Sequence, residues 1–352
     1  TEFTVAQAIE VLRKSGRISC ADDVLSLNIC EPAMGSGAFA VEAVNQLADL
    51  YLELKQDELD ERIDPGMHAE EVQKVRAAIA LHQVYGVDLN ATAVELAEIS
   101  LWLDTMSPEL KAPWFGLHLR RGNSLIGATR ATVTANSVKK RAYLTETPTH
   151  HPVSSVATSI ETGAIDPKVD GRIHHFLVPS KGWGAAADAK DLKDLAADEI
   201  KKMKTWRREV QKGFTAEEVK TLQGLSRQVE KLWQFALARL RIAEDQVSRD
   251  ITVWGQQPDE PREVVTREAI EAELFGNMDG AYQRLRLVMD AWNALWFWPI
   301  TEADQLPDHK AWLAMVKDAL GTPVSTATPK PGQYIFASDM SWDDLGIVED
   351  HD

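Results

Sequence analysis

Acidic and amide side chains follow three apolar runs in the first third of the chain. Glu31 follows the first run and precedes a turn with two glycines, Gly35 and Gly37. Asp88 ends the second run, and Asn123 follows the third. In a sheet of parallel strands such ends meet at one edge, where glycine-rich turns hold nucleotides. The spacing therefore predicts a nucleotide-like ligand held by two carboxylates and an amide.

The positions of the carboxylates indicate which kind of ligand fits. Gly35, Gly37 and Ala40 match the Gly-x-Gly-x-x-Ala dinucleotide pattern. That pattern expects a ribose-binding acid about 20 residues further on, whereas Asp88 lies 51 residues after Gly37. A pyrophosphate beside the Glu31 carboxylate is also repelled, by about 1 to 4 kcal/mol. The pattern therefore favours a ligand without phosphate.

A ligand with a cation next to its ribose reverses the sign of that interaction. S-adenosylmethionine is such a ligand, since it carries an ammonium and a sulfonium group. Gly35 and Gly37 would let the backbone approach it closely, and Asp88 would accept both ribose hydroxyls. Asn123 would bind the adenine edge. The expected walls of the adenine pocket are Phe39, Leu89 and Leu125. Taken singly, the acids also fit helix caps and the glycines a simple turn.

Alternating helices and strands are predicted to position these residues. The pattern indicates a helix up to about Lys14, a buried strand, a helix, a second helix, a short strand, a helix and a third strand with its exit turn. After the first helix, these elements are expected at Val24–Cys30, Ala38–Leu54, His68–His82, Val84–Asp88, Asn90–Met106 and Gly116–Gly127. Such repeats are typical of an α/β fold with a doubly wound parallel sheet, here over residues 1–127.

The rest of the chain has a different texture. Residues 128–187 are rich in Ser, Thr, Pro and Gly, which predicts an irregular linker. Residues 188–322 predict a mainly α-helical insert or second domain, with helices at 188–212, 215–248, 266–295 and 308–320. Residues 323–352 predict a return segment with a possible strand at Gln333–Ala337.

Charge and composition bound the function. The chain has a net charge of -16 and two cysteines, too few for a disulfide framework or a metal cluster. No apolar run reaches the ~20 residues of a membrane span, so we expect a cytoplasmic protein without membrane contact. Six cations gather in Lys201–Lys212, inside a middle third of net charge +2. This helix is either a phosphate-facing surface or a solvated helix face.

Two further features fit structural roles. The run Ala291–Pro299 holds three tryptophans and a phenylalanine without adjacent cations, which predicts a buried helix end. The adjacent histidine pairs, His150/His151 and His174/His175, lack the spacing of a metal site, so we expect no bound metal.

Three stretches carry a resemblance to a known family. "EPAMGSGAF", "VYGVDLNATAVELAEISLWL" and "GNSLIG" resemble motifs I, II and III of N6-adenine DNA methyltransferases. Among these, the chain looks most like the large enzymes of type IIG restriction-modification and of BREX- or DISARM-type phage defence. The resemblance covers residues 1–127. It implies part of a Rossmann-like class I methyltransferase core.

The resemblance also implies a cofactor, a substrate and site residues. Such enzymes bind S-adenosylmethionine and methylate the amine of a flipped adenine in double-stranded DNA. Glu31 corresponds to the acid near the methionine amine, and Asp88 to the ribose acid. Asn123 stands where the family commonly has Asp. The cofactor loop would consist of Glu31, Pro32, Ala33, Met34, Gly35, Ser36 and Gly37.

The sequence also departs from the family. Members carry an Asn-Pro-Pro-aromatic catalytic loop, whereas this chain contains no Pro-Pro pair. The N-terminal Tyr/Phe-Thr-Pro element is missing too, and the chain begins without Met. We therefore expect an internal fragment without catalytic residues, inactive alone, whose missing N- and C-terminal parts complete the enzyme. The alternatives are a non-catalytic DNA-binding or scaffold subunit with a degenerate methyltransferase fold, and an NAD-dependent oxidoreductase.

Overall fold

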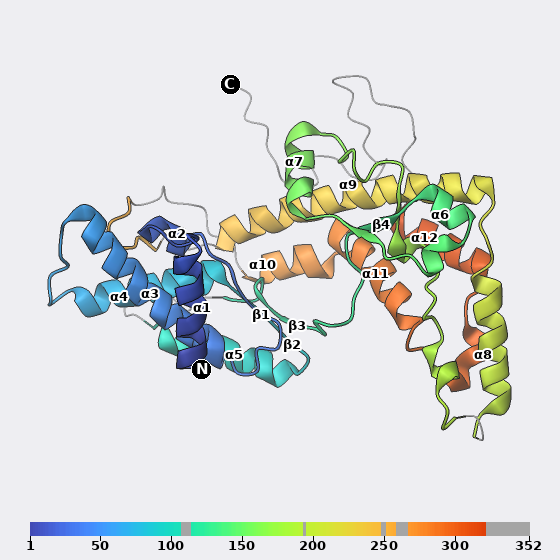
Figure 1. Ribbon diagram of the computed structural model, residues 1–352, viewed down its shortest axis with the longest axis horizontal. Coiled ribbons are helices and arrows are strands. Elements are labelled where there is room, and N and C mark those ends of the chain that lie inside the picture. The colour runs from blue at the N-terminus through green and yellow to red at the C-terminus, as the bar shows by residue number, and fades with distance from the viewer. Residues whose placement is uncertain (107–113, 193–194, 248–250, 258–266, 322–352) are drawn as a thin grey trace. The chain divides into compact units, whose positions relative to one another are not determined.

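The computed structural model describes residues 1–106, 114–192, 195–247, 251–257 and 267–321 (Figure 1). These residues form two compact units. The first contains residues 1–125 and 243–267, and the second contains residues 126–242 and 268–352, as far as they are described. The return segment predicted at 323–352, with its possible strand, lies outside the described residues.

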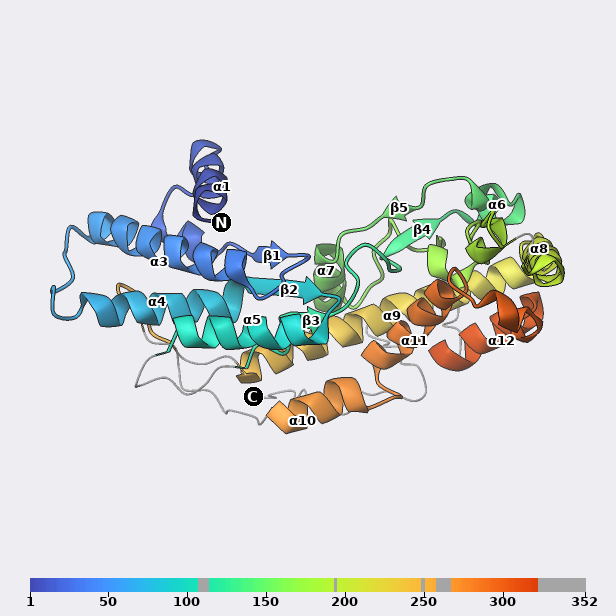
Figure 2. The same cartoon turned by 90° about the horizontal axis from the view of Figure 1, so that it is seen from below.

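The first unit contains a three-stranded parallel sheet with the order β1-β2-β3 (Figure 2). The strands are Ile29–Glu31 (β1), Val84–Asp88 (β2) and Leu119–Arg121 (β3). Glu31 pairs with Gly86, and Asp88 pairs with Arg121. The carboxyl ends of β1 and β2 therefore lie at the same edge of the sheet.

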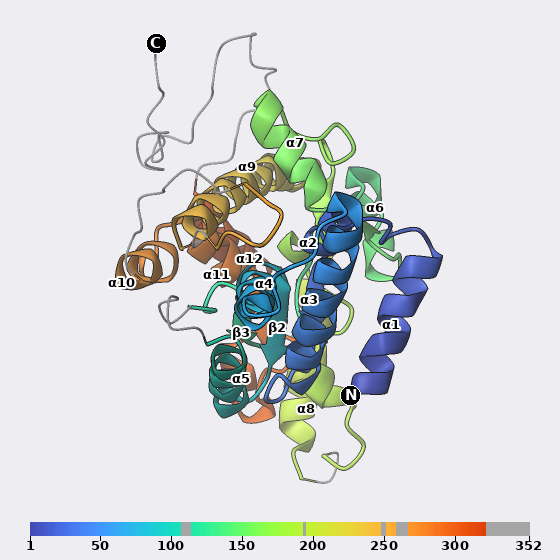
Figure 3. The ribbon, with the colours of Figure 1, turned by 90° about the vertical axis from the view of Figure 1, so that its left-hand side faces the viewer.

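Helices before and between the strands supply the core of this unit. They are α1 (Glu2–Lys14), α2 (Ala21–Leu25), α3 (Ala38–Leu59), α4 (His68–Gln83) and α5 (Ala91–Asp104). The long helix α3 contacts each of the others (Figure 3). It does so because Ala40, Val44, Leu47 and Tyr51 recur at helical spacing and are all buried.

The strand predicted at Val24–Cys30 is wrong in its first half. Val24 lies in α2, where it is fully buried by helix packing. Asp23, in the first turn of this helix, stabilises its start, because its carboxylate accepts the amides of Ser19 and the N-cap residue Cys20 at 2.8 and 3.1 Å. The remaining strand, β1, is not buried as expected: Cys30 is exposed, since β1 stands at an edge of the sheet. The capping hydrogen bonds of α2 thus favour a helix where the apolar run alone predicted a strand.

The other predictions for this unit agree with the structure. The helices near Lys14 and His68 and the strand Val84–Asp88 are confirmed, and Asn90 caps α5. Helix α3 continues to Leu59, beyond the predicted end. Parallel strands joined by helices confirm an α/β arrangement. Across the sheet the described strands follow their order in the chain, β1, β2, β3. A doubly wound sheet also needs strands that continue in the opposite direction from β1, so it stays a prediction.

The second unit combines helices with a small antiparallel sheet of order β5-β4-β6. The strands are β4 (Ala131–Val133), β5 (Thr149–His150) and β6 (Ile173–His174). The helices are α6 (Ala135–Lys139), α7 (Ser154–Thr162), α8 (Ala197–Val210), α9 (Ala216–Val247), α10 (Arg267–Glu271), α11 (Ala281–Ala294) and α12 (His309–Leu320). The end of α9, from Ala243 onward, belongs to the first unit. Short 3-10 segments are η1 (Ala142–Leu144), η2 (His175–Leu177), η3 (Ala185–Asp188) and η5 (Ile300–Gln305), and a π turn, η4, spans Ala272–Gly276.

Two predictions for this unit are corrected. Residues 128–187 are not an irregular linker, because they contain β4, β5, β6 and two helices. Buried polar side chains hold them together: Arg130 donates to the carbonyl of Pro152, and the Thr132 hydroxyl lies 2.8 Å from His151 Nε2. Composition does not reveal such contacts. The helix predicted at 266–295 is two helices, since the polar turn Asn277–Gly280 separates α10 from α11 and Asn277 accepts the Asp279 amide. The helix predicted at 188–212 begins only at Ala197.

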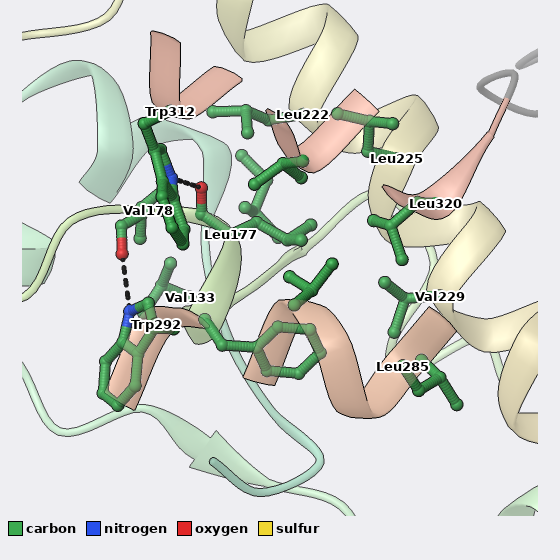
Figure 4. Close-up of a cluster of buried hydrophobic side chains, with 14 of the residues drawn as sticks. Val133, Leu177, Val178, Leu222, Leu225, Val229, Leu285, Trp292, Trp312 and Leu320 are labelled. Atoms are coloured by element: carbon green, nitrogen blue, oxygen red, sulfur yellow. Dashed lines mark hydrogen bonds between the residues drawn. The ribbon is translucent and has the colours of Figure 1, made fainter. Parts of the chain in front are cut away.

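Tryptophans fix the core of the second unit (Figure 4). Trp292 and Trp312 are buried, and each donates its indole N–H to a backbone carbonyl, of Val178 at 2.9 Å and Leu177 at 3.0 Å. Trp183 in turn donates to the carbonyl of Trp292 at 3.0 Å. The burial of Trp292 at the end of α11 confirms the predicted buried helix end, although Phe297 is 63% exposed.

Among the described residues, no helix is both long enough and apolar enough to cross a membrane.

Candidate cofactor-binding site

The glycine turn is tied directly to the end of β2. The amide of Gly35 donates to Asp88 Oδ2 at 2.9 Å, and the amide of Met34 donates to the carbonyl of Val87 at 3.1 Å. Gly37 then opens α3 in the left-handed conformation, with φ of 79°. The structure thus brings the predicted turn and the predicted ribose acid into contact, although they are 53 residues apart.

The side chain of Glu31, the last residue of β1, reaches the start of α3. Its Oε2 accepts the amide of Ala40, in the first turn of this helix, at 3.2 Å. Burial raises the pKa of Glu31, and the hydrogen bond from Ala40 only partly offsets this. Among the described residues no cation pairs with Glu31, and its Oε1 has no hydrogen-bond partner. A half-buried carboxylate of this kind is suited to a cationic ligand.

Asp88 is in the opposite electrostatic situation. Its Oδ1 accepts the amide of Asn90 at 2.8 Å and its Oδ2 that of Gly35. These two amides, and to a smaller extent the amide of Leu89, lower the pKa of Asp88. An ionised carboxylate has about four acceptor positions. Asp88 is therefore a carboxylate held in its charged form by backbone amides, with acceptor capacity left for a ligand.

Small residues allow the turn to lie close to the sheet and to α5. A Cβ on Gly86 would come within 2.3 Å of the Met34 sulfur, and a Cβ on Gly37 within 3.2 Å of the Ala97 Cβ. Met34 is only 4% exposed. Its side chain therefore anchors the turn in the core. Gly86 and Ala97 were not among the predicted site residues, although a glycine inside a strand commonly marks such a close approach.

The residues expected around an adenine ring are less closely gathered. The side chains of Phe39, Leu89 and Leu125 are 45%, 65% and 94% exposed. Asn123 is exposed as well, and its Oδ1 accepts the amide of Leu125 at 3.0 Å. Pro32, Ala33 and Ser36 are also exposed. The structure thus joins Glu31, the turn and Asp88, whereas the adenine wall stays a prediction.

A polar cluster supports β2 and β3 from the last turns of α9. Tyr85 and His118 stack with ring centroids 4.1 Å apart, and both contact Glu244 Oε1, at 3.3 and 3.1 Å. The bond with His118 lowers the pKa of Glu244 despite its burial. Tyr85 lies three residues before Asp88, so the cluster holds the strand that carries Asp88.

Comparison with known proteins addresses the same segment. Residues 13–112 match the family described as "MmeI, DNA-methyltransferase domain". A stretch of 118 residues is 30% identical to a protein of Methanocaldococcus jannaschii whose name describes a type II restriction enzyme and methyltransferase. No solved structure matches the chain.

Residues 13–112 are therefore similar to the DNA-methyltransferase domain of a restriction-modification enzyme.

The methyltransferase match has clear limits along both chains. It includes Glu31, the glycine turn and Asp88, but it ends before Asn123 and Leu125. The alignment with the archaeal relative covers 30% of this chain and 9% of the relative. This chain therefore spans only a small part of the relative that it matches.

A second polar constellation, in the other unit, has a structural role. Ser226 Oγ lies 2.7 Å from His174 Nδ1, and His174 Nε2 lies 2.9 Å from Glu230 Oε1. This order resembles a nucleophile, base and acid. All three residues are at most 2% exposed, and Arg130 holds both carboxylate oxygens of Glu230 at 3.0 and 2.7 Å. Because Ser226 is buried, a substrate cannot contact it, and the network stabilises the fold.

A cleft elsewhere on the first unit is separate from the candidate site. It lies between α1 and α3 and encloses about 510 Å³. Its lining mixes apolar groups such as Ile9 with charges of both signs, such as Arg13 and Glu53. None of the predicted cofactor residues lines it.

Proposed function

We propose that residues 1–125 bind S-adenosylmethionine and that the chain is part of an adenine-N6 DNA methyltransferase of a restriction-modification or phage-defence system. One observation carries this proposal. Two carboxylates, Glu31 and Asp88, stand at the ends of adjacent parallel strands; Asp88 accepts an amide of the glycine turn, and Glu31 accepts an amide of the helix that this turn opens.

The chemistry of these residues fits the cofactor. Glu31 offers a half-buried carboxylate with a raised pKa, which an ammonium group would stabilise in its ionised form. Asp88 keeps acceptor positions for the two ribose hydroxyls. Gly35 and Gly37 leave no side chain between the backbone and the methionine part. When bound, the cofactor supplies an electrophilic methyl group; the residues of this chain bind and orient it.

The same geometry disfavours a dinucleotide. Dinucleotide folds use the free amides at a helix N-terminus to bind pyrophosphate. Here the amide of Ala40 is already bonded to the carboxylate of Glu31. A pyrophosphate would have to displace this carboxylate or lie against its negative charge. An NAD-dependent oxidoreductase is therefore poorly supported.

The groups that polarise the adenine amine are proposed to lie elsewhere in a longer polypeptide. The 352 residues contain no Pro-Pro pair and hence no Asn-Pro-Pro-aromatic loop. The archaeal relative, of which the match covers 9%, is long enough to hold such a loop outside the matched part. This chain by itself is therefore expected not to methylate DNA.

Nucleoside mass spectrometry tests this proposal. The full-length gene product is incubated with duplex DNA and S-adenosylmethionine, beside its Asp88→Ala variant and a matched control, Glu61→Ala, at an exposed acid away from the turn. We expect N6-methyladenine with the unaltered protein and with Glu61→Ala, and none with Asp88→Ala.

Three outcomes would contradict the proposal. Methylated cytosine in place of adenine would overturn the adenine specificity. Cofactor binding without any DNA methylation by the full-length product would support a non-catalytic subunit. Methylation by the 352-residue chain alone would refute the external catalytic loop.

A further inference from the structure

One face of α8 carries cations that form no ion pair within the described part of the chain. Lys201, Lys204 and Arg208 follow each other at helical spacing; Lys201 and Arg208 are exposed, and Lys204 is half-buried beside the buried Ile200. Among the described residues none of these three cations forms an ion pair. Arg208 donates only to the Thr205 hydroxyl, at 3.3 Å. The row from Lys201 to Arg208 is about 10 Å long at 1.5 Å per residue.

A second group of cations adjoins the end of this helix. Lys139, Lys140 and Arg141 are consecutive and exposed where α6 ends. The side chain of Arg141 packs against Gly213, just past α8, with its Cγ and Cδ 3.7 Å from where a Cβ on that glycine would stand. The rings of Tyr143 and Phe214, 6.4 Å apart, hold the same two segments together.

The acids around these cations are already engaged. Glu209 pairs with Lys212, Asp188 pairs with Arg207, and Asp304 pairs with Lys202. Glu218 accepts the amide and hydroxyl of Thr215. Cations therefore outnumber the acids that remain free to pair with them, although Arg207 and, to a smaller extent, Lys204 both lower the pKa of the Asp188 carboxyl. We call this area the basic surface; its residues are Lys139, Lys140, Arg141, Lys201, Lys204 and Arg208.

We propose that the basic surface binds the phosphate backbone of duplex DNA, independently of base sequence. Phosphates recur about every 3.4 Å along one strand of the duplex, so the row on α8 alone spans about three of them. Lysines predominate, and they act as point charges rather than as readers of base edges. In a chain of net charge -16, such a surface would also decide which side faces DNA. This inference rests on the proposed function, which makes DNA the substrate.

Fluorescence anisotropy with two labelled duplexes of different sequence, titrated over a range of KCl concentrations, tests the inference on the 352-residue chain. The neutral variant is Lys201→Gln/Lys204→Gln/Arg208→Gln, which keeps good helix formers. A charge-retaining variant is Lys201→Arg/Lys204→Arg/Arg208→Lys. A matched control removes three exposed cations elsewhere in the same unit, Lys168→Gln/Arg286→Gln/Lys317→Gln.

We expect the neutral variant to bind both duplexes roughly tenfold or more weakly, with a slope of log affinity against log salt smaller by about 2 to 3. The charge-retaining and control variants should bind like the unaltered chain. An unchanged slope in the neutral variant would overturn the inference. So would an equal loss in the control variant, because the effect would then reflect net charge alone.

Cofactor titration of the same proteins separates this inference from the proposed function. If the chain binds S-adenosylmethionine but no duplex, the inference fails and the cofactor site stands. If it binds duplex with the expected salt dependence but no S-adenosylmethionine, the cofactor site fails and the basic surface stands.

Discussion

At the scale of single residues, Glu31 and Asp88 carry the same charge but have pKa values shifted in opposite directions. Burial raises the pKa of Glu31, whereas the amides of Asn90 and Gly35 lower that of Asp88. The first carboxylate gains from a cation that it lacks in the protein alone. The second needs no cation and is ready to accept hydroxyl groups.

The raised pKa of Glu31 predicts a pH dependence of cofactor binding. Only the ionised carboxylate attracts an ammonium group, so affinity should fall as the pH drops through the raised pKa, at a higher pH than for an ordinary glutamate. Because the bound cation favours ionisation, binding should release protons in that range. Calorimetry in buffers of different ionisation enthalpy measures this release. A Glu31→Gln variant that releases protons as the unaltered chain does would contradict the assignment.

Gly86 predicts a packing effect beneath the turn. A Gly86→Ala methyl group would collide with the Met34 sulfur, so we expect a loss of about 1 to 3 kcal/mol in the free energy of unfolding. In a Met34→Ala background the same substitution should cost less, since the colliding atoms are gone. Denaturant unfolding of the two single variants and the double variant measures this coupling. Strictly additive costs would show that the two residues do not contact each other.

At the scale of elements, α5 begins at a cap that also borders the site. The Asn90 side chain accepts the amide of Thr92 at 3.0 Å, and the Asn90 backbone amide holds Asp88. Asn90→Ala should therefore lower the free energy of unfolding by about 1 kcal/mol, and Asn90→Asp, which keeps the cap, should lower it far less. Chemical denaturation compares the two, and equal losses would argue against the cap.

The same elements show what the sequence could predict. Helices with a clear apolar period or cap, such as those starting at His68 and Asn90, were predictable because local signals and packing agree. Val24 was not, because an apolar run is compatible with a strand or a buried helix, and the cap at Asp23 decided between them. Residues 128–187 were misjudged because their buried polar network depends on partners such as Glu230, about 100 residues away.

The candidate site was predictable to the extent that it depends on strand ends. Glu31, the glycine turn and Asp88 follow apolar runs, and parallel strands bring such ends together. The supporting contacts were not predictable. Gly86 is needed only because Met34 packs on it, and Glu244 reaches His118 across 126 residues of sequence. Such pairs have no local pattern.

At the scale of the whole molecule, a buried ionic network stabilises the second unit. The buried bonds of Glu230 with His174 and Arg130 outweigh desolvation and lower its pKa to about 2. Because this pKa lies below the ordinary value of 4.5, the stabilisation is fully present above about pH 4.5. It is lost as the pH falls towards about 2.

Glu230→Gln predicts a selective loss in the second unit. The substitution leaves Arg130 and His174 buried without their carboxylate, which costs about 3 to 5 kcal/mol, and it removes the acid dependence just described. Calorimetric unfolding at neutral and acid pH measures both effects. A variant whose stability is unchanged at neutral pH would show that the network contributes little.

The central claim is that Glu31 and Asp88 hold S-adenosylmethionine through one turn, and amide NMR of this chain tests it most directly. The amides of Gly35 and Ala40 report on the two carboxylates, because they donate to Asp88 and Glu31. Millimolar S-adenosylmethionine should shift both signals in the unaltered chain, and these shifts should be lost in an Asp88→Asn/Glu31→Gln variant. If saturating cofactor leaves both amides unmoved, or shifts them equally in the variant, the site is wrong.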